Sequence, residues 1–221
     1  MNNLNKIPIH DSSLRHSTGQ AIYIDDMPEQ ENLLHGAPVL SKVACGKIKK
    51  INFDKLNDLP FFTKIITAKD IPGENEIGPI KNGEPILADD FFSYLGQPVA
   101  IVLAKTHQEA IYASSLVEIE LEFTTKPILN LDDAYEQKSF LEDPMILEKG
   151  NIKKDMSKSN YTLSGNFVIG GQDHFYLETH VAITFPGEND EYVVWSSTQH
   201  PTEVQHGVGT VSYTHPEPTR P

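Results

Sequence analysis

The residues best suited to chemistry are concentrated at positions 170–180, where two glycines, an amide, carboxylates, imidazoles and aromatics lie close together. The adjacent Gly170 and Gly171 allow a backbone to approach a ligand closely or to adopt a positive φ angle. The carboxamide of Gln172, which follows them, can donate and accept hydrogen bonds at a fixed point. This combination suits contact with a polar cofactor, and a β-bulge is the alternative explanation of the two glycines.

The remaining residues of this stretch give weaker signals. His174 and His180 are six positions apart, a spacing that neither a helical turn nor a strand face converts into a standard zinc pair. Ordinary hydrogen bonding is therefore the alternative to metal binding for these histidines. Phe175, Tyr176 and Glu178 are of types that more often serve a structural purpose.

Three further groups of residues have both a chemical and a structural interpretation. The pairs Asp25-Asp26 and Asp89-Asp90 could be acid pairs, but adjacent carboxylates on a strand point to opposite faces. Their sequences indicate turns that expose the carboxylates to water. Gly96-Gln97-Pro98 precedes an apolar run, where it predicts a turn, with ligand contact as the alternative.

The composition limits the class of protein. The 221 residues include 31 acidic and 18 basic side chains, for a net charge of −13, which argues against a nucleic acid partner. The single cysteine, Cys45, excludes an intrachain disulfide and any cysteine-rich zinc or iron–sulfur site, and a reducing compartment fits. No apolar run approaches the roughly 18 residues of a membrane span, and no signal-peptide core is present. We therefore expect a cytoplasmic protein with no membrane partner.

Nucleotide-binding and nucleophile motifs are also missing from the sequence. It contains neither a Gly-x-Gly-x-x-Gly pattern nor a Walker loop, so a Rossmann or P-loop nucleotide site has no support. No serine lies in a nucleophile elbow, so the spacing does not support a Ser-His-Asp site.

The elements that would position these residues begin with strands and one helix. The strands expected in the first half of the chain are residues 21–24, 34–43, 61–68 and 99–104, the last apolar enough to be covered on both faces. Thr106 and Glu109 form a capping-box pattern that opens a helix over 108–117, with Ala110, Ala113 and Val117 on one face. Residues 117–123 alternate as a half-buried strand does. This strand, helix and strand predict an α+β or α/β domain that closes near Lys126-Pro127.

The second half of the chain is predicted to be mainly loop and β-structure. Residues 128–159 are polar and loop-like, with one helical turn at 131–135, and are expected to be a connector. A three-stranded meander is predicted from residues 161–168, 181–185 and 192–196. The glycines and prolines after about His206 predict no regular structure there.

Several motifs, in order, resemble one family. They are His10-Asp11-Ser12, Thr18-Gly19-Gln20-Ala21-Ile22-Tyr23-Ile24-Asp25-Asp26, Ala68-Lys69-Asp70-Ile71-Pro72-Gly73-Glu74-Asn75, Glu84-Pro85-Ile86-Leu87-Ala88, Gly96-Gln97-Pro98-Val99-Ala100 and Gly170-Gly171-Gln172-Asp173-His174-Phe175-Tyr176-Leu177-Glu178-Thr179. They are similar to the molybdenum-binding subunits of the aldehyde oxidase and xanthine dehydrogenase family, with the closest likeness to its purine-oxidising members. The last motif resembles the signature beside the molybdenum centre, and residues 170–179 are called the signature segment below.

The resemblance implies an α+β fold and a division of the chain. An N-terminal arm (1–18) would precede an α/β hammerhead domain (19–127), and a connector (128–159) would lead to the start of the first molybdopterin-binding domain (160–205). Residues 206–221 are expected to be an unrelated or disordered tail. In the family, the glutamine of the signature hydrogen-bonds an oxo ligand of the molybdenum, so Gln172 is the implied cofactor contact, with Gly170 and Gly171 beside it.

The family chemistry implied is hydroxylation of hypoxanthine and xanthine to urate, with water as the oxygen source and NAD as the final acceptor. The cofactor is molybdenum-molybdopterin, with FAD and 2Fe-2S clusters expected on a partner subunit. The family's Gly-Gly-Gly-Phe-Gly-Gly loop, substrate residues and general-base glutamate lie downstream and have no counterpart here. We therefore expect no catalytic residue in this fragment, and inactivity of the fragment alone. The alternatives are a fragment of an aldehyde oxidase-like molybdenum hydroxylase and a non-catalytic interaction module.

Overall fold

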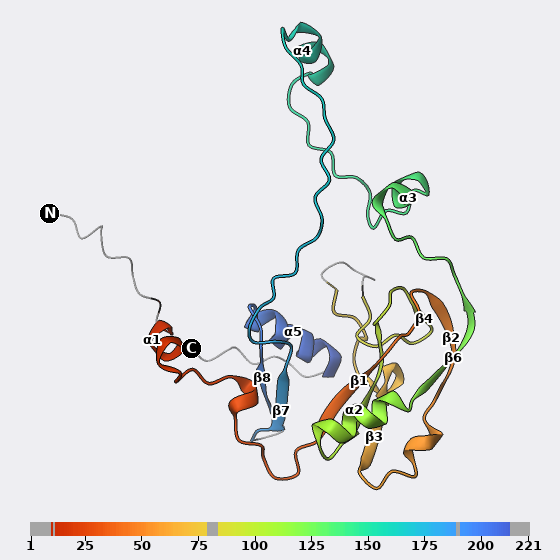
Figure 1. Cartoon of the computed structure of the whole chain (residues 1–221), viewed down its shortest axis with the longest axis vertical. Helices are drawn as coiled ribbons and strands as arrows, with labels where there is room; N and C mark the ends of the chain where they lie inside the picture. The colour runs from red at the N-terminus through yellow and green to blue at the C-terminus, as the bar shows by residue number, and fades with distance from the viewer. Residues whose placement is uncertain (1–9, 11, 79–83, 189–190, 213–221) are drawn as a thin grey trace, which may run out of the picture. The chain divides into compact units, whose positions relative to one another are not determined.

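The computed structural model describes residues 10, 12–78, 84–188 and 191–212 (Figure 1). The chain divides into two units, one drawn from residues 1–127 and 178–221 and the other from residues 128–177. Each unit is described by itself. The second unit contains a run of more than fifteen consecutive residues with neither helix nor strand. The first unit holds every strand of the described chain.

The first sheet of unit 1 is built around strand β5 (Pro98–Ala104). β1 (His35–Leu40) and β3 (Phe62–Thr67) flank it, and both run antiparallel to it. Val99 and Val102 of β5 are fully buried, as the nearly continuous apolar sequence predicts for a strand covered on both faces. The expected strands at 34–43, 61–68 and 99–104 are therefore confirmed.

The second sheet has the order β4-β2-β6 and is also antiparallel, from β4 (Phe91–Phe92), β2 (Gly46–Asn52) and β6 (Glu118–Thr124). β6 follows the predicted alternation, because its carboxylates face solvent while Ile119 and Leu121 are half-buried. The carboxylates pair with lysines, as in the 3.0 Å contact between Lys47 Nζ and Glu122 Oε2. The register and the alternation thus agree on which face of the sheet meets the core.

Helix α2 (His107–Ser115) lies against the first sheet, where Figure 1 shows it crossing in front of β1 and β3. Thr106 caps it as predicted, because its Oγ1 accepts the backbone N–H of Glu109 at 3.3 Å. Ala110 and Ala113 are buried, which confirms this part of the predicted helix face. Val117 is also buried, but it lies beyond the helix, which ends at Ser115 and not at Val117 as predicted. The predicted strand, helix and strand are present as β5, α2 and β6. The two strands that the helix joins, however, belong to different sheets.

Short helices complete the first part of unit 1. They are α1 (Ser13–Thr18), η1 (Ile24–Asp26), η2 (Asp54–Leu56) and η3 (Ala68–Asp70). The predicted strand at 21–24 is wrong, because η1 occupies its end. The side chain of Asp26 accepts the N–H of Tyr23 at 3.0 Å, and this local bond competes with strand pairing.

The rest of unit 1 is a hairpin of β7 (Ala182–Pro186) and β8 (Tyr192–Ser196), followed by helix α5 (Pro201–Ser212). The ring centroids of Phe185 and Trp195 are 4.8 Å apart in an edge-to-face arrangement. We expected no regular structure after about His206, and this was wrong for residues 206–212, because α5 continues through its glycines. The expected tail at 213–221 lies outside the described residues.

Unit 2 contains α3 (Leu131–Glu136) and α4 (Ile152–Lys158), each capped by an asparagine side chain at its N-terminus. α3 confirms the predicted helical turn, but α4 falls within the expected connector and was not predicted. The predicted strand at 161–168 is wrong, since no partner strand pairs with it among the described residues. Leu163 and Phe167 are 100% and 91% exposed. The sequence of residues 161–168 favours a strand, but no ladder satisfies the backbone groups of these residues.

Helix α5 is tied to the loop after η3 through Gly73. The backbone N–H of Gly73 donates to the carbonyl of Val211 at 2.8 Å, which satisfies one of the last carbonyls of the helix. A Cβ atom at position 73 would lie 2.1 Å from the carbonyl oxygen of Thr210, so the backbones fit only with glycine.

We predict that Gly73→Ala lowers the free energy of unfolding by about 1–3 kcal/mol, since two backbones must separate to admit the methyl group. Gly207→Ala is the matched control, because nothing lies within 4 Å of its Cβ position in the same helix. It should be neutral or stabilising by about 0.5–1 kcal/mol. Urea denaturation of both variants checks this, and equal stabilities would contradict the tight contact at Gly73.

Candidate functional site

The two glycines of the signature segment lie in an exposed stretch with no helix or strand. Nothing lies within 4 Å of the Cβ position of either Gly170 or Gly171. Neither has a positive φ angle, since the described glycines that do are Gly19, Gly96 and Gly150. A β-bulge is excluded because the segment is not in a sheet. Of the two interpretations, ligand contact therefore remains, because the backbone here is open and another group can approach it closely.

The side chain of Gln172 is exposed, and it makes no hydrogen bond to another residue in the part of the chain that the structure describes. The next residue turns the chain, because Asp173 Oδ1 accepts the N–H of Phe175 at 2.9 Å and Phe175 has a φ angle of 47°. The carboxamide therefore projects from an open backbone just before a turn. An amide in this position can donate to an oxygen or accept from a donor without bringing a charge.

The end of the signature segment is anchored within unit 1 by Glu178. Its Oε1 accepts the backbone N–H of Ile24, a buried residue, at 2.6 Å. The structural role expected for Glu178 is confirmed. Phe175 is 96% exposed, so the structure gives it no packing role. The sequence could not indicate the partner of Glu178, because the two residues are 154 positions apart.

The histidines and paired aspartates do not form a site. Among the described residues, no group of three or more His, Cys, Asp or Glu side chains could hold a metal ion. Asp26 caps η1, and Asp89 and Asp90 lie in a bend. The turn interpretation is therefore confirmed for both aspartate pairs.

The Gly-Gln-Pro motif is a turn, as predicted, and it holds a buried polar cluster that the sequence did not reveal. Gly96 has a φ angle of 86°, which a glycine adopts without strain. Gln97 is 2% exposed, and its Oε1 accepts the N–H of Ser93 at 2.8 Å. Ser41, which is 3% exposed, donates its hydroxyl to the carbonyl of Tyr94 at 2.8 Å. These paired polar groups fix the loop before β5 and the end of β1 against each other.

Two titratable groups in or beside the motifs, the carboxyl of Asp70 and the phenol of Tyr94, have pKa values that their partners shift. Asp70 accepts both the backbone N–H and the hydroxyl of Thr67, and these bonds hold the pKa of its carboxyl below the usual value. Tyr94 donates its hydroxyl to Glu84 Oε1 at 2.6 Å, which raises the pKa of the phenol. Both interactions stabilise loops, and neither lies in the signature segment.

The residues of the signature segment fit a molybdopterin centre in their chemistry. Gln172 supplies a neutral donor with no competing intramolecular partner in the described chain, and the open Cβ positions of Gly170 and Gly171 leave room for a close backbone approach. The described residues offer no cluster of three or more His, Cys, Asp or Glu side chains that could hold a metal ion.

The chain combines two antiparallel sheets and α2 with the signature segment that follows them in the sequence. Two family models match these two parts. "Aldehyde oxidase and xanthine dehydrogenase, a/b hammerhead domain" matches residues 18–125, and "Molybdopterin cofactor-binding domain" matches residues 135–217. The chain belongs to the aldehyde oxidase and xanthine dehydrogenase family of molybdenum hydroxylases. The second match runs past residue 206, into the part that we expected to be an unrelated tail.

Curated relatives include members that act on different substrates. A xanthine dehydrogenase of Calliphora vicina is 38% identical over 92% of this chain, and xanthine dehydrogenase/oxidase of Gallus gallus is 36% identical over 89%. Aldehyde oxidase 2 of Macaca fascicularis is also 36% identical, over 91%. The chain spans about 15% of the length of these relatives.

Solved structures agree on the fold. Aldehyde oxidoreductase of Desulfovibrio gigas superposes with a TM-score of 0.78 and 23% identity. The match covers 93% of this chain and 25% of the chain of that protein. Quinoline 2-oxidoreductase of Pseudomonas putida 86 gives a TM-score of 0.76 with 21% identity over 93% of this chain and 28% of its own. The predicted α+β hammerhead with the start of a molybdopterin-binding domain is thus confirmed. No helix of the described residues is long and apolar enough to cross a membrane.

We predict that Glu178→Ala lowers the free energy of unfolding of unit 1 by about 1.5–3 kcal/mol, because the N–H of Ile24 would lose a charged acceptor. Glu178→Gln keeps an acceptor oxygen and should lose less. Urea denaturation of both variants gives the values. Equal losses would show that the hydrogen bond is not what stabilises this contact.

Proposed function

We propose that the chain is part of the molybdenum subunit of a xanthine dehydrogenase, which hydroxylates hypoxanthine and xanthine to urate with water as the oxygen source and NAD as the final acceptor. The observation that carries the proposal is Gln172, an exposed carboxamide with no hydrogen-bond partner in the described chain, placed after two open glycines. The order of the motifs, and the identity of 36–38% to curated xanthine dehydrogenases, support the purine substrate.

The role proposed for this chain is positioning at the cofactor. Molybdopterin with its molybdenum, when bound, supplies the two-electron redox chemistry of the hydroxylation. Gln172 would donate its amide N–H to an oxo ligand of the bound metal, and as a neutral group it would do so without a charge that binds the metal instead. Gly170 and Gly171 would let the backbone lie against the cofactor. The general-base glutamate that the family resemblance implies has no counterpart in these residues, so we assign no general base.

The proposal includes the partners of the subunit. FAD and 2Fe-2S clusters would lie on a partner subunit that accepts the electrons, which fits a chain whose single cysteine cannot bind such a cluster. A cytoplasmic location is part of the same proposal, because one cysteine forms no intrachain disulfide and so fits a reducing compartment.

A second candidate is a molybdenum hydroxylase with another substrate. The observation in its favour is the equal similarity of aldehyde oxidase 2 of Macaca fascicularis, at 36%, and of the nicotinate hydroxylase of Emericella nidulans, at 38%. Relatives named for three substrate classes are thus equally similar to these residues. The protein side chains that contact the substrate would lie in parts of the protein that these residues do not include.

Gln172→Ala in the complete enzyme should lower kcat for xanthine by about tenfold to a hundredfold, the usual effect of losing a hydrogen bond to a charged or strongly polar group. Asn166→Ala is the matched control, because it removes another exposed amide of the same stretch and should leave kcat unchanged. Molybdenum content is measured in both variants. If Gln172→Ala keeps full turnover with full metal content, Gln172 does not have this role.

The substrate is tested with the complete enzyme and the 221 residues side by side. The complete enzyme should convert xanthine to urate with NAD faster than it oxidises benzaldehyde or hydroxylates nicotinate. The 221 residues should make no urate, because the general base and the substrate residues that the family resemblance implies have no counterpart among them. Preference for an aldehyde would favour the second candidate, and urate from the 221 residues would overturn the proposed inactivity.

A further inference from the structure

We propose that the hammerhead domain carries a second ligand site, a cavity of about 630 Å³ between its two sheets that binds a small organic anion with an apolar body. The cavity is lined by the end of β1, residues 41–43 that follow it, the end of α2, and β6. None of its lining residues belongs to the signature segment. Its volume lies in the range of roughly 300–1,000 Å³ that is typical of sites for small molecules.

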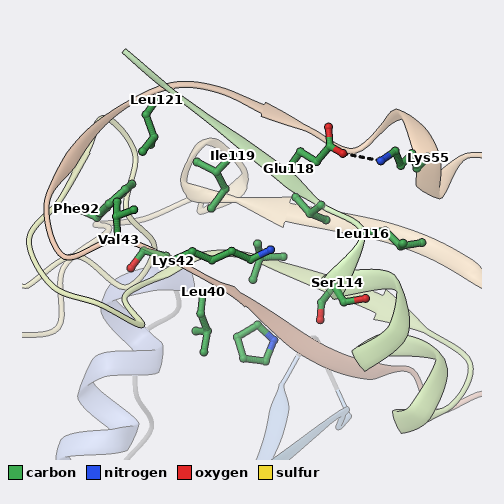
Figure 2. Close-up of a pocket in the computed structure, with 15 residues that line it drawn as sticks. Leu40, Lys42, Val43, Lys55, Phe92, Ser114, Leu116, Glu118, Ile119 and Leu121 are labelled. Carbon is green, nitrogen blue, oxygen red and sulfur yellow. Dashed lines mark hydrogen bonds and ion pairs between the residues drawn. The ribbon is translucent and has the colours of Figure 1, made fainter. Parts of the chain in front are cut away.

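The walls of this hammerhead cavity are apolar. Val39, Phe92 and Val117 are buried at 4%, 1% and 3% exposure, and they belong to the hydrophobic core. Val43, Ile119 and Leu121 are half-buried and complete the apolar lining. Figure 2 shows Leu121, Val43 and Phe92 around one end of the cavity. An aliphatic chain or a ring that enters it would remove both its own surface and these side chains from water.

Two lysines bring positive charge to the cavity, and one carboxylate of its lining faces them. Lys55 Nζ lies 2.5 Å from Glu118 Oε1. The pKa of the Glu118 carboxyl is lowered mainly by its hydrogen bond to Lys55 and also by the charge of Lys42. Lys42 makes no direct ion pair with any residue that the structure describes, and its side chain extends across the cavity in Figure 2. The lining therefore carries two ammonium groups against one carboxylate, beside an apolar floor. This is the reverse of the chain as a whole, whose net charge is −13.

Lys42 extends from a fixed point of the backbone. The preceding Ser41 exchanges backbone hydrogen bonds with the Gly96-Gln97 turn, where its N–H donates to the carbonyl of Gln97 at 2.9 Å and its carbonyl accepts from Gly96 at 3.0 Å. The β1–β5 register also shifts between Val39 and Leu40, immediately before this point. Such irregularities redirect side chains at the ends of strands. The stem of Lys42 is thereby held over the cavity while its ammonium stays accessible to an anion.

The other polar groups do not compete for this role. The hydroxyls of Ser114 and Ser115 donate to the carbonyls of Ile111 and Tyr112 in their own helix, at 2.9 and 2.6 Å. Glu118 makes its direct ion pair with Lys55, so only the longer-range attraction of its charge reaches Lys42. A monocarboxylate with an apolar tail complements this arrangement, because the tail matches the walls and the carboxylate matches the ammonium of Lys42. A cationic or neutral amphiphile would match only the walls.

The test compares octanoate, octanol and octylamine on the full chain, with binding followed through backbone amide resonances. Octanoate should bind most tightly and shift the amides of residues 40–43 and 114–121. Lys42→Met keeps an apolar side chain of similar length, and it should weaken octanoate about threefold to fivefold, the upper range for an exposed ion pair, without changing octanol. Lys69→Met is the matched control, since Lys69 is exposed, lies outside the cavity and forms no ion pair among the described residues.

Each result decides the proposal. Selective weakening of octanoate by Lys42→Met, with shifts confined to the hammerhead cavity, supports it. It is overturned if Lys69→Met weakens octanoate equally, because the effect would then be general charge. It is also overturned if octylamine binds as tightly as octanoate, or if the shifts lie elsewhere. Well-dispersed spectra of both variants establish that each is folded, so a loss of binding is not a loss of structure. The result is independent of the role of Gln172, which lies outside the cavity.

Discussion

The structure of unit 1 depends on the burial of β5 from both sides. Its backbone is paired on one edge by β1 and on the other by β3, while its side chains meet α2 and the second sheet. Val99, Ala100, Val102 and Ala104 have no exposed surface. Complete burial of each valine side chain stabilises the fold by about 1.5–3 kcal/mol. The turn before β5 is consequently fixed as well, and its buried Gln97 and Ser41 are hydrogen-bonded rather than left to destabilise the core.

Unit 1 supplies two kinds of position. Where β1 ends beside β6, the hammerhead cavity forms around the stem of Lys42. In the N-terminal part of the unit, the N–H of Ile24 anchors Glu178, near the end of the signature segment. The first is a partly open cavity with apolar walls, while the second fixes one end of an open chain.

Unit 2 has the opposite physical character. None of its described side chains is buried, and its two short helices are held by local caps such as the bond from Asn130 Oδ1 to the N–H of Asp133. Exposed apolar residues of the 161–169 run, among them Leu163 and Ile169, bury little surface against the described chain. An open backbone of this kind is suited to contact with another group, as the proposed role of Gln172 requires.

Sequence patterns determined the parts of this protein that depend on local or periodic information. The apolar run of β5, the capping box at Thr106 and the alternation of β6 each satisfy backbone or burial requirements within a few residues. The order of short motifs identified the family and singled out Gln172.

The predicted strands at 21–24 and 161–168 were wrong for a physical reason, since a strand needs a partner, and the sequence pattern does not contain the partner. Helix α5 was missed because glycines that are unfavourable in an isolated helix are tolerated where Gly73 caps its end. Only the tertiary structure decided the pairing of Glu178 with Ile24, the burial of Gln97 and the hammerhead cavity. The first and the last bring together residues that are far apart in the chain. The burial of Gln97 depends on a turn whose geometry is set by packing.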